Sequence, residues 1–442
     1  MTMRIMPNVY FQKFGDCCYV RHVGLAKDFM MNEISYDILE YINVHEDCNA
    51  DSLCDYLKEI YDIEDNDEFI SDIKEFIDQL ILDEIVEAGV TEEAEEEYIR
   101  GIIQQKCFEE HRLFTACLEL TYRCNEKCIH CYVDTPCDYG NELTTDEVKD
   151  VIRQLKDLGC MGVLLTGGEA TVRKDFIEIA KFVKSQGMMF DVYTNGLAVS
   201  EEIIDELIEL KPNSVSFSFY GGTAEVHDRI TTVQGSFEKS LKTLLTIKCA
   251  GMDTYIKTVI MKDNVDDFEN LLRLGKRISV PVLPALSVMP SHGGKSAEPF
   301  RLLDTEKYMD VLRLEEKYQG KRFDTTVSKR GRYICASGLD SLSIDPFGGV
   351  HPCNAHPMNL GNVRETTIRD IWENSEQLKA LRDIRPVDLA SECNGCDYFD
   401  YCSVCMGSAI RENEKLAPCS DTCKIAKAYH CMYTQNKKER GE

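Results

Sequence analysis

Between residues 118 and 289 the sequence alternates short apolar runs with longer amphipathic ones, and this alternation restricts the fold more than any other feature. Strand-length apolar runs occur at Leu118–Thr121, Met161–Thr166, Phe190–Thr194, Ser214–Phe219, Thr254–Met261 and Val282–Met289. Between them, helical periodicity is found at residues 173–187, 200–210, 236–250 and 265–277. A capping box at Thr144–Glu147 starts a further helix.

Parallel strands that are joined by helices form a sheet covered by those helices. The sequence therefore predicts an α/β fold of about six strand–helix units, curled into a full or partial barrel. Barrels of this kind carry their chemistry in the segments that follow the carboxyl ends of the strands. Those segments are where a functional site is expected.

Three cysteines, Cys124, Cys128 and Cys131, follow the first of these strands in a C-x3-C-x2-C pattern. Their thiolates can bind three irons of a four-iron cluster, which normally takes four cysteines. The remaining iron would be open to a substrate or a cofactor. On spacing alone, a zinc site and a chance arrangement remain open as alternatives.

The triplet, with His130 directly before its last cysteine, resembles the cluster-binding motif of the radical S-adenosylmethionine (SAM) enzymes. One strand–helix unit later, Thr166-Gly167-Gly168-Glu169 resembles the element that binds the amino group of SAM in that family. Glycines permit close backbone approach, and a carboxylate accepts hydrogen bonds from an ammonium group. Without the triplet, a Gly-Gly pair after a strand would be an ordinary tight turn.

Two further strand ends resemble family positions that contact the ribose and carboxylate of SAM. Asn195 follows the third strand, and Ser218 lies at the end of the fourth. The resemblance implies that both side chains contact SAM. The nearby pair His227-Asp228 is interpreted as a turn cap rather than as a proton-transfer pair.

The last 110 residues contain a second set of cysteines, at Cys335, Cys353, Cys393, Cys396, Cys402, Cys405, Cys419, Cys423 and Cys431. The two CxxC pairs in this set can bind zinc as a ribbon. The five additional cysteines exceed one zinc site and suit two four-iron clusters.

With Ser343–Cys353, Leu360–Val363 and Ile371-Trp372, this region resembles the SPASM extension, which carries two auxiliary [4Fe–4S] clusters. The resemblance implies that the first cluster is bound by Cys335, Cys353 and Cys405, and the second by Cys393, Cys396 and Cys402. Cys419 and Cys423 are assigned to the remaining positions, with Cys431 as a substitute. The step from Cys402 to Cys405 departs from the C-x3-C of sulfatase-maturing relatives, so full ligation of the first cluster stays open. An open iron there would accept a substrate thiolate.

The first hundred residues are predicted to form a separate unit. Strand-like stretches at Asn8–Phe14, Cys18–Val23 and Asp28–Met31 precede helical patterns at Ser35–Asn43, Ala50–Tyr61 and Asp67–Leu82. This order predicts a winged helix-turn-helix, whose usual partner is DNA. Residues 1–100 contain 7 Lys and Arg against 26 Asp and Glu, a net charge of −19. Such a surface repels phosphates and attracts basic peptides, so nucleic-acid binding is not expected.

The unit resembles the RiPP recognition element, a winged-helix module that binds the leader of a ribosomally made peptide. In that family the leader adds a strand to a sheet edge. The predicted organisation is a recognition element at 1–89, a charged helical linker at 90–113, a partial (β/α)6 radical SAM barrel at 114–310 and a SPASM domain at 311–442.

The chain contains 21 cysteines but neither a signal peptide nor a membrane-spanning apolar run. A cytoplasmic location, where thiols stay reduced and bind metals or iron–sulfur clusters, is therefore predicted, without membrane contact.

The resemblance implies an enzyme that binds SAM at the open iron and produces a 5′-deoxyadenosyl radical, which removes a hydrogen atom from a precursor peptide. Flavodoxin or ferredoxin would supply the electrons. The C-x5-C-x2-C spacing at Cys396, Cys402 and Cys405 resembles thioether-forming sactipeptide and ranthipeptide maturases, so a bond from cysteine sulfur to carbon is expected. The alternatives are a streptide-type carbon–carbon cross-link, peptide dehydrogenation, oxidative decarboxylation and a non-catalytic metal-bearing scaffold that binds peptides.

Overall fold

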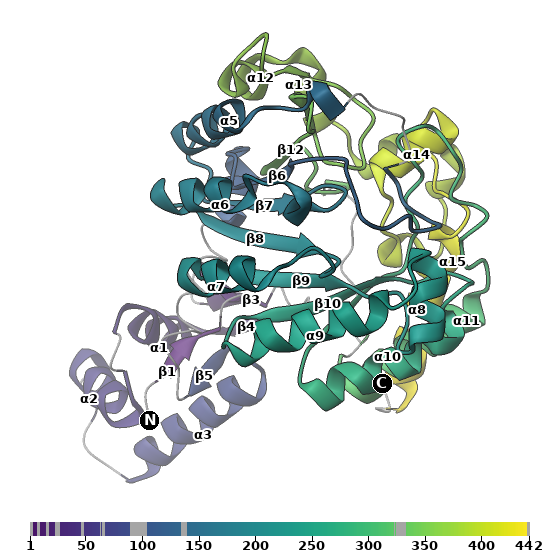
Figure 1. The fold of residues 1–442 in the computed structure, drawn as a ribbon. Coiled ribbons are helices and arrows are strands. Elements are labelled where there is room, and N and C mark those ends of the chain that lie inside the picture. Colours follow the sequence, from purple (N-terminus) through teal and green to yellow (C-terminus); the bar gives the residue numbers. More distant parts are fainter. Residues whose placement is uncertain are drawn as a thin grey trace. The chain divides into compact units, whose positions relative to one another are not determined.

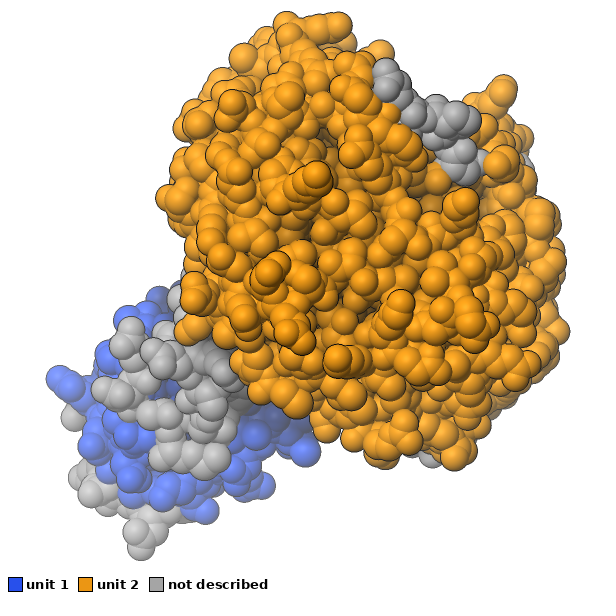
Figure 2. Space-filling view, viewed as in Figure 1, with its two compact units in different colours: residues 1–106 blue, residues 107–442 orange. Residues whose placement is uncertain are grey.

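The computed structural model describes residues 3–6, 9–14, 17–22, 27–45, 48–61, 63, 67–88, 104–133, 139–321, 323 and 333–439. The chain divides into two compact units, Met1–Lys106 and Cys107–Glu442 (Figure 2). Most of the predicted linker, residues 90–103, lies outside the described residues, whereas residues 104–110 are helical.

The first unit consists of two small sheets and three helices. Its three-stranded antiparallel sheet has the order β2 (Val9–Phe14), β3 (Cys17–His22), β4 (Lys27–Asn32), and β1 (Met3–Ile5) pairs with β5 (Val86–Ala88). The helices are α1 (Glu33–Val44), α2 (Ala50–Tyr61) and α3 (Asp67–Leu82). These elements confirm the predicted three strands and three helices, while the winged-helix and leader-binding assignments stay predictions.

Hydrophobic burial holds the first unit together. In β3 every second side chain is buried, so Cys18 and Val20 face the helices. The Asn32 side chain accepts a hydrogen bond from the Ser35 amide and caps α1. Asn32 thus ends β4 and starts α1 directly, without a connecting loop.

The second unit is built on a nine-stranded sheet with the order β11-β10-β9-β8-β7-β6-β12-β13-β14. Its strands are β6 (Thr115–Glu119), β7 (Gly162–Thr166), β8 (Met189–Thr194), β9 (Ser214–Ser218), β10 (Thr254–Val259), β11 (Val282–Ala285), β12 (Ser341–Ile344), β13 (Gly349–His351) and β14 (Gly361–Asn362). The six strands from β6 to β11 are parallel neighbours in chain order (Figure 1). The predicted α/β fold with a central parallel sheet is confirmed.

Helices connect the parallel strands, at the five positions that the sequence predicts and also at residues 224–231 and 305–319. They are α5 (Thr145–Asp157), α6 (Phe176–Ser185), α7 (Glu201–Leu210), α8 (Ala224–Thr231), α9 (Ser236–Cys249), α10 (Phe268–Ile278) and α11 (Thr305–Gln319). The capping box at Thr144 is present, because Thr144 and Glu147 exchange side-chain-to-backbone hydrogen bonds. The carboxyl-terminal part adds α12 (Ile368–Asn374), α13 (Glu376–Arg382), α14 (Met406–Asn413) and α15 (Thr422–Glu439).

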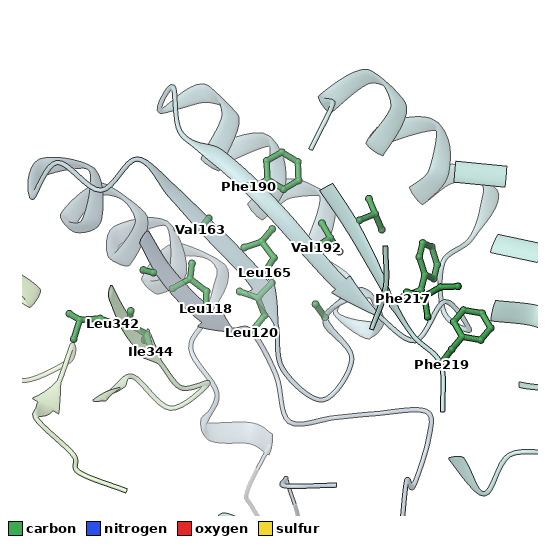
Figure 3. Close-up of a cluster of buried hydrophobic side chains, with 14 of the residues drawn as sticks. Leu118, Leu120, Val163, Leu165, Phe190, Val192, Phe217, Phe219, Leu342 and Ile344 are labelled. Carbon is green, nitrogen blue, oxygen red and sulfur yellow. The ribbon is translucent and has the colours of Figure 1, made fainter. Parts of the chain in front are cut away.

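A row of apolar side chains crosses the sheet on its buried face (Figure 3). The parallel register places Leu118 beside Leu165, Leu165 beside Val192, and Val192 beside Val215. All four are at most 3 % exposed. Each such side chain stabilises the fold by about 1.5–3 kcal/mol when it leaves water. Burial of this row therefore favours one register of the strands, which sets where their carboxyl ends lie relative to one another.

Two details differ from the sequence-based expectation. The last parallel strand, β11, ends at Ala285 rather than at Met289. It pairs with β10 and forms the edge of the sheet. An edge strand tolerates Pro284, because the missing amide hydrogen is not needed for pairing on the outer side. The sheet also continues beyond β6, because β12 from the cysteine-rich region pairs with it in parallel. Both edges of β6 are therefore paired with other strands. Among the described residues, none of the helices is long and apolar enough to cross a membrane.

Candidate active site

The three cysteines of the first motif lie in the loop that leaves β6, and their side chains line a cavity of about 720 Å³. Glu126, His130 and Gly168 share its wall with Tyr122. Residues after β11, among them Met289, Lys295 and Phe300, line it as well. The cavity thus lies at the carboxyl ends of the strands, where α/β barrels have their active sites.

The two glycines after β7 hold the start of the cysteine loop. The Gly168 amide donates to the Thr121 carbonyl at 2.7 Å, and the Glu169 amide donates to the Arg123 carbonyl at 2.9 Å. A Cβ on Gly167 would lie 2.3 Å from the Thr121 oxygen, and one on Gly168 would lie 2.5 Å from the Arg123 oxygen. Gly167 also has a φ of +139°, which side chains disfavour. Close approach to the cysteine loop therefore requires glycine at both positions.

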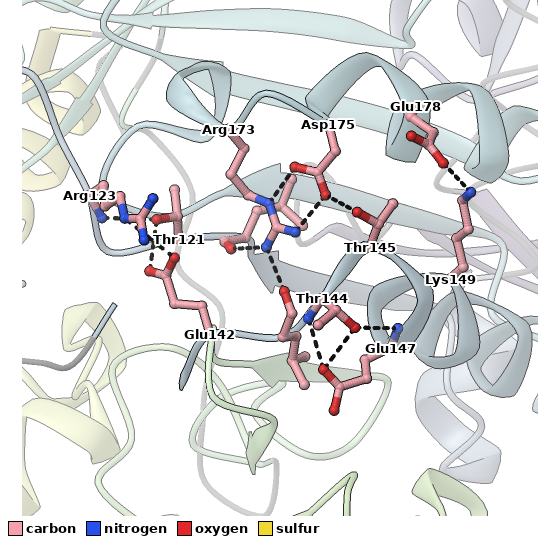
Figure 4. A network of polar contacts seen from close by, with 12 residues as sticks. Thr121, Arg123, Glu142, Thr144, Thr145, Glu147, Lys149, Arg173, Asp175 and Glu178 are labelled. Carbon is pink, nitrogen blue, oxygen red and sulfur yellow. Dashed lines mark hydrogen bonds and ion pairs between the residues drawn. The ribbon is translucent and has the colours of Figure 1, made fainter. Parts of the chain in front are cut away.

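A polar network fixes the same loop from the other side (Figure 4). Arg173 donates to the carbonyls of Leu120 and Leu143 at 2.8 and 3.1 Å, and its guanidinium pairs with Asp175 at 2.7 Å. The Thr121 hydroxyl donates to Glu142 at 2.8 Å. Because Leu120 and Thr121 precede the first cysteine by only a few residues, this network determines where the triplet begins.

Glu169 connects the ends of β7 and β8. Its carboxylate is 1 % exposed and accepts hydrogen bonds from the Thr194 hydroxyl at 2.8 Å and the Asn195 amide at 2.6 Å. The Asn195 side chain donates to Asn125 at 2.6 Å and lies 3.8 Å from the Cys124 sulfur. Asn195 is therefore next to the triplet, as predicted. That Glu169 and Asn195 bind SAM stays a prediction.

The chemistry of the loop suits a cationic cluster. Burial raises the pKa of the Cys124 thiol to about 12 and that of Cys128 further, so both are protonated at neutral pH unless a bound cation stabilises their thiolates. Burial also lowers the pKa of His130 to about 4, which keeps it neutral. The buried atoms Glu126 Oε1 and His130 Nδ1 have no hydrogen-bond partner among the described residues. The three thiols could bind a cluster, and the unsatisfied polar atoms beside them in the cavity could bond to a polar ligand of that cluster.

Ser218 lies at the end of β9, paired in register with Lys257, and the described residues that line the cavity do not include it. The interpretation of His227-Asp228 as a turn cap is confirmed. The Asp228 carboxylate accepts from the amides of Gly235 and Phe237, at 2.6 and 2.9 Å, at the start of α9. The end of α8 also supports the triplet, since the Ile129 amide donates to the Ile230 carbonyl at 3.0 Å.

The first auxiliary set is brought together. Cys335, Cys353 and Cys405 lie close enough for their charges to interact: after burial, the charges of the other two thiols help raise the Cys335 pKa to about 11. Cys117, on β6, is also a neighbour of Cys353. The pairing of β12 with β6 thus brings this set beside the strand that leads to the triplet.

The second auxiliary set is compact as well. Cys393 and Cys402 belong to one small buried cluster, and the Cys396 amide donates to the Cys393 carbonyl at 3.3 Å. Cys423 is an electrostatic neighbour of Cys396. Cys419 lies instead beside Arg301 and Glu412, while Cys431 is on α15.

Among the described residues, no three His, Cys, Asp or Glu side chains are grouped as ligands of one metal ion. Thiolates that share a four-iron cluster bind different irons and lie farther apart than ligands of one zinc ion. The zinc alternative therefore gains no support from the described part of the chain.

Several buried polar residues near the site are absent from the sequence-based predictions. Glu119, on β6, accepts hydrogen bonds from Tyr122 and Tyr132, which flank the triplet. Arg301, 3 % exposed, pairs with Glu412 at 2.5 Å and Asp421 at 3.1 Å. The sequence contains a signal for Glu119, which is an acidic residue inside an apolar strand run. It contains no such signal for the ion pairs of Arg301, because Glu412 and Asp421 are more than a hundred residues away.

Comparison with known proteins matches the first cysteine region and the first part of the second. Residues 118–275 match the model of the radical SAM superfamily, and residues 335–397 match the SPASM model, described as an iron–sulfur cluster-binding domain. An AdoMet-dependent heme synthase of Methanosarcina barkeri is 28% identical over 66% of this chain and 90% of its own length. The mycofactocin maturase MftC of Mycolicibacterium smegmatis is 28% identical over 64% of this chain and 75% of its own length.

Solved structures share the fold. SuiB of Streptococcus suis matches with a TM-score of 0.56 at 14% identity, covering 94% of this chain and 99% of SuiB. SuiB has also been crystallised with S-adenosylmethionine and with a precursor peptide, SuiA. The enzyme anSMEcpe with bound AdoMet matches with a TM-score of 0.57 at 17% identity, covering 73% of this chain and 97% of that protein.

Proposed function

Because this chain is a radical SAM enzyme with a SPASM domain, we propose that it is a peptide maturase that cross-links a ribosomally synthesised precursor. The observation that carries the proposal is the extent of the shared fold. The first unit makes up 106 of 442 residues, so a match over 94% of the chain has to include most of it. The protein matched in this way is one that has been crystallised with a precursor peptide.

The residues of the site have separable tasks in this proposal. Cys124, Cys128 and Cys131 would hold the cluster that binds SAM, and the Gly168 loop would hold the amino end of SAM against it. When bound, the cluster and SAM supply a radical that removes a hydrogen atom from the substrate. The protein orients the substrate in the cavity and excludes water from it. An external donor such as flavodoxin or ferredoxin would supply the electron.

The first unit would bind the leader of the precursor. In its three-stranded sheet β2 and β4 are the edge strands, the places where a peptide strand is added, and residues 1–100 carry a net charge of −19, which favours a leader with basic residues. Holding the leader raises the concentration of the core peptide near the cavity. Deleting residues 1–90 should therefore weaken precursor binding. Equal affinity after the deletion would remove this part of the proposal.

For the new bond we favour a thioether. The spacing of Cys396, Cys402 and Cys405 resembles that of thioether-forming maturases. Cys335 interacts electrostatically with Cys353 and Cys405, which supports one cluster held by these three thiols, and an open fourth position would bind a substrate thiolate. A carbon–carbon cross-link and a dehydrogenation are the other outcomes of the test.

The test uses the short reading frames beside the gene. Each encoded peptide is incubated anaerobically with the reconstituted enzyme, SAM and reductant, and is then analysed by mass spectrometry. A loss of two hydrogens together with the loss of an alkylatable thiol supports the thioether, whereas the same loss with all thiols free supports a carbon link or a dehydrogenation, which fragment spectra of the peptide distinguish. A peptide left unchanged by an enzyme that cleaves SAM would overturn the proposal.

The relatives called AdoMet-dependent heme synthase favour a second candidate, a role in haem formation. Their similarity extends over 65–66% of this chain, which need not include the first unit. Haem formation by the purified enzyme, followed by its absorbance, would support this candidate and overturn the peptide maturase.

A further inference from the structure

A buried carboxylate lies directly behind the wall of the cavity. Glu119 is the last residue of β6 and is 3 % exposed. Successive side chains of a strand point to opposite faces, so Glu119 shares a face with Cys117 and is opposite Leu118, which packs in the apolar core. A carboxylate at such a place is costly unless it is hydrogen-bonded, so it calls for an explanation.

Two tyrosine hydroxyls satisfy this carboxylate. Tyr132 donates to Oε1 at 2.9 Å, and Tyr122 donates to Oε2 at 3.2 Å. Tyr122 also lines the cavity, whereas Glu119 does not. Tyr122 therefore connects the cavity wall with a buried proton acceptor.

The second neighbour of Tyr122 is His292. Its Nδ1 lies 3.4 Å from the Tyr122 hydroxyl, and its Nε2 lies 3.0 Å from the Asn354 carbonyl. The carbonyl requires the proton on Nε2, which leaves Nδ1 as an acceptor. Burial lowers the pKa of His292, so it does not compete with a carboxylate for a proton at neutral pH.

The surroundings place the titration of Glu119 near neutrality. Burial raises its pKa to about 7, although the hydrogen bonds from Tyr132 and Tyr122 lower it. The charged and titratable groups around it come from each adjoining element: Cys117 on β6, Asp345 and His351 at β12 and β13, and Arg411 on α14. Asp345 raises the pKa of Glu119, and His351 lowers it.

We propose that Glu119, acting through the Tyr122 hydroxyl, takes up the proton that the substrate releases when its cross-link forms. The inference rests on the proposed function. After one hydrogen atom has left the peptide, the carbon radical bonds to a sulfur or carbon that carries a hydrogen. The hydrogen on that atom leaves as a proton, from a thiol when it binds as the thiolate or from a C–H bond when the new bond forms, and one electron passes to an oxidised iron–sulfur cluster. Tyr122 accepts this proton while passing its own to Glu119, so the tyrosine stays neutral.

The test compares Glu119→Gln with the wild type. Glutamine preserves the size of the side chain but cannot take the proton. We expect the yield of cross-linked peptide per 5′-deoxyadenosine to fall at least tenfold, because general-base catalysis contributes about 100-fold or more. Glu119→Asp should recover part of that ratio. In the wild type the cross-linking rate should rise as the pH increases through about 7, when Glu119 ionises, and in Glu119→Gln this rise should be absent.

Glu315→Gln is the matched control. Glu315 on α11 is 1 % exposed, its pKa is also raised by burial, and its partner is Lys321 rather than a cavity residue. This variant should keep the wild-type ratio and pH profile. Difference infrared spectra provide a second readout: because the pKa of Glu126 is also raised to about 7, the protonated-carboxyl signal that titrates near pH 7 should be reduced, not abolished, in Glu119→Gln and unchanged in Glu315→Gln.

Three results decide the question. If the wild type cross-links the peptide and Glu119→Gln does so with the same yield per 5′-deoxyadenosine and the same pH profile, the role of Glu119 is overturned while the proposed function stands. A wild type that cleaves SAM but leaves every peptide unchanged overturns the proposed function and this role with it. A lower ratio in Glu119→Gln but not in Glu315→Gln, with recovery in Glu119→Asp, supports the role.

Discussion

Replacing Gly168 by alanine should weaken SAM binding, and the structure sets the magnitude. The new Cβ would lie 2.5 Å from the Arg123 oxygen, where an ordinary contact begins at 3.4 Å, so the two loops would have to separate by about 0.9 Å. That movement would lengthen the Gly168–Thr121 and Glu169–Arg123 hydrogen bonds from 2.7 and 2.9 Å to beyond bonding distance. Two lost bonds cost about 1–3 kcal/mol and the overpacking a further 1–3.

The movement displaces the backbone just before Cys124, so we expect the cost to appear in SAM affinity. At 1.4 kcal/mol per tenfold, the lower limit of about 2 kcal/mol corresponds to a Kd raised about 30-fold. Calorimetric titration of the anaerobically reconstituted variant, at matched iron content, measures this. Gly251→Ala is the control, because Gly251 has a φ of +83° but nothing within 4 Å of a new Cβ. It should cost about 1–2 kcal/mol of stability and leave SAM affinity unchanged. A Gly168→Ala enzyme within twofold of the wild-type Kd would refute the reasoning.

Three further predictions concern stability. Arg301→Met leaves the buried Asp421 and the half-buried Glu412 without this cation and should lower the free energy of unfolding by about 3–5 kcal/mol, whereas Arg313→Met, at an exposed pair, should change it by less than about 1; equal urea midpoints would contradict this. Asp228→Ala removes the acceptor at the start of α9 and should cost about 1–2 kcal/mol in the same assay, and an unchanged midpoint would rule out the capping role. The hydrogen bond from Arg364 lowers the pKa of Glu147 to about 2, so its stabilisation is complete above about pH 4.3 and is lost as the pH falls towards 2; the Tm difference between wild type and Arg364→Gln should shrink over that range, and a constant difference would contradict the assignment.

The local part of the fold is predictable from the sequence. The strand with Leu165 has a nearly continuous apolar sequence, whereas the strands with Val192 and Phe217 alternate apolar with polar residues; both patterns are typical of strands, and the capping box at Thr144 marks its helix correctly. The cysteine triplet after β6 and the glycines after β7 are visible for the same reason, since each motif occupies one short segment of chain.

Contacts between distant segments are not predictable in this way. The pairing of β12 with β6 joins residues more than two hundred positions apart, and no periodicity in either strand specifies the partner. Arg301 is similar, because it meets Asp421 only after the cysteine-rich region has folded back. Burial of Glu119 depends on Tyr122, Tyr132 and on that same return of the chain. The sequence shows an acid in a strand but not the two hydroxyls that satisfy it.

Production of 5′-deoxyadenosine tests the central claim most directly. After anaerobic reconstitution the wild type should contain about twelve irons, three clusters of four, and should release 5′-deoxyadenosine when SAM and reductant are added. Simultaneous replacement of Cys124, Cys128 and Cys131 by alanine should leave about eight irons and abolish that release. Undiminished release from the triple variant, or a wild type that stays colourless and binds only zinc, would contradict the account.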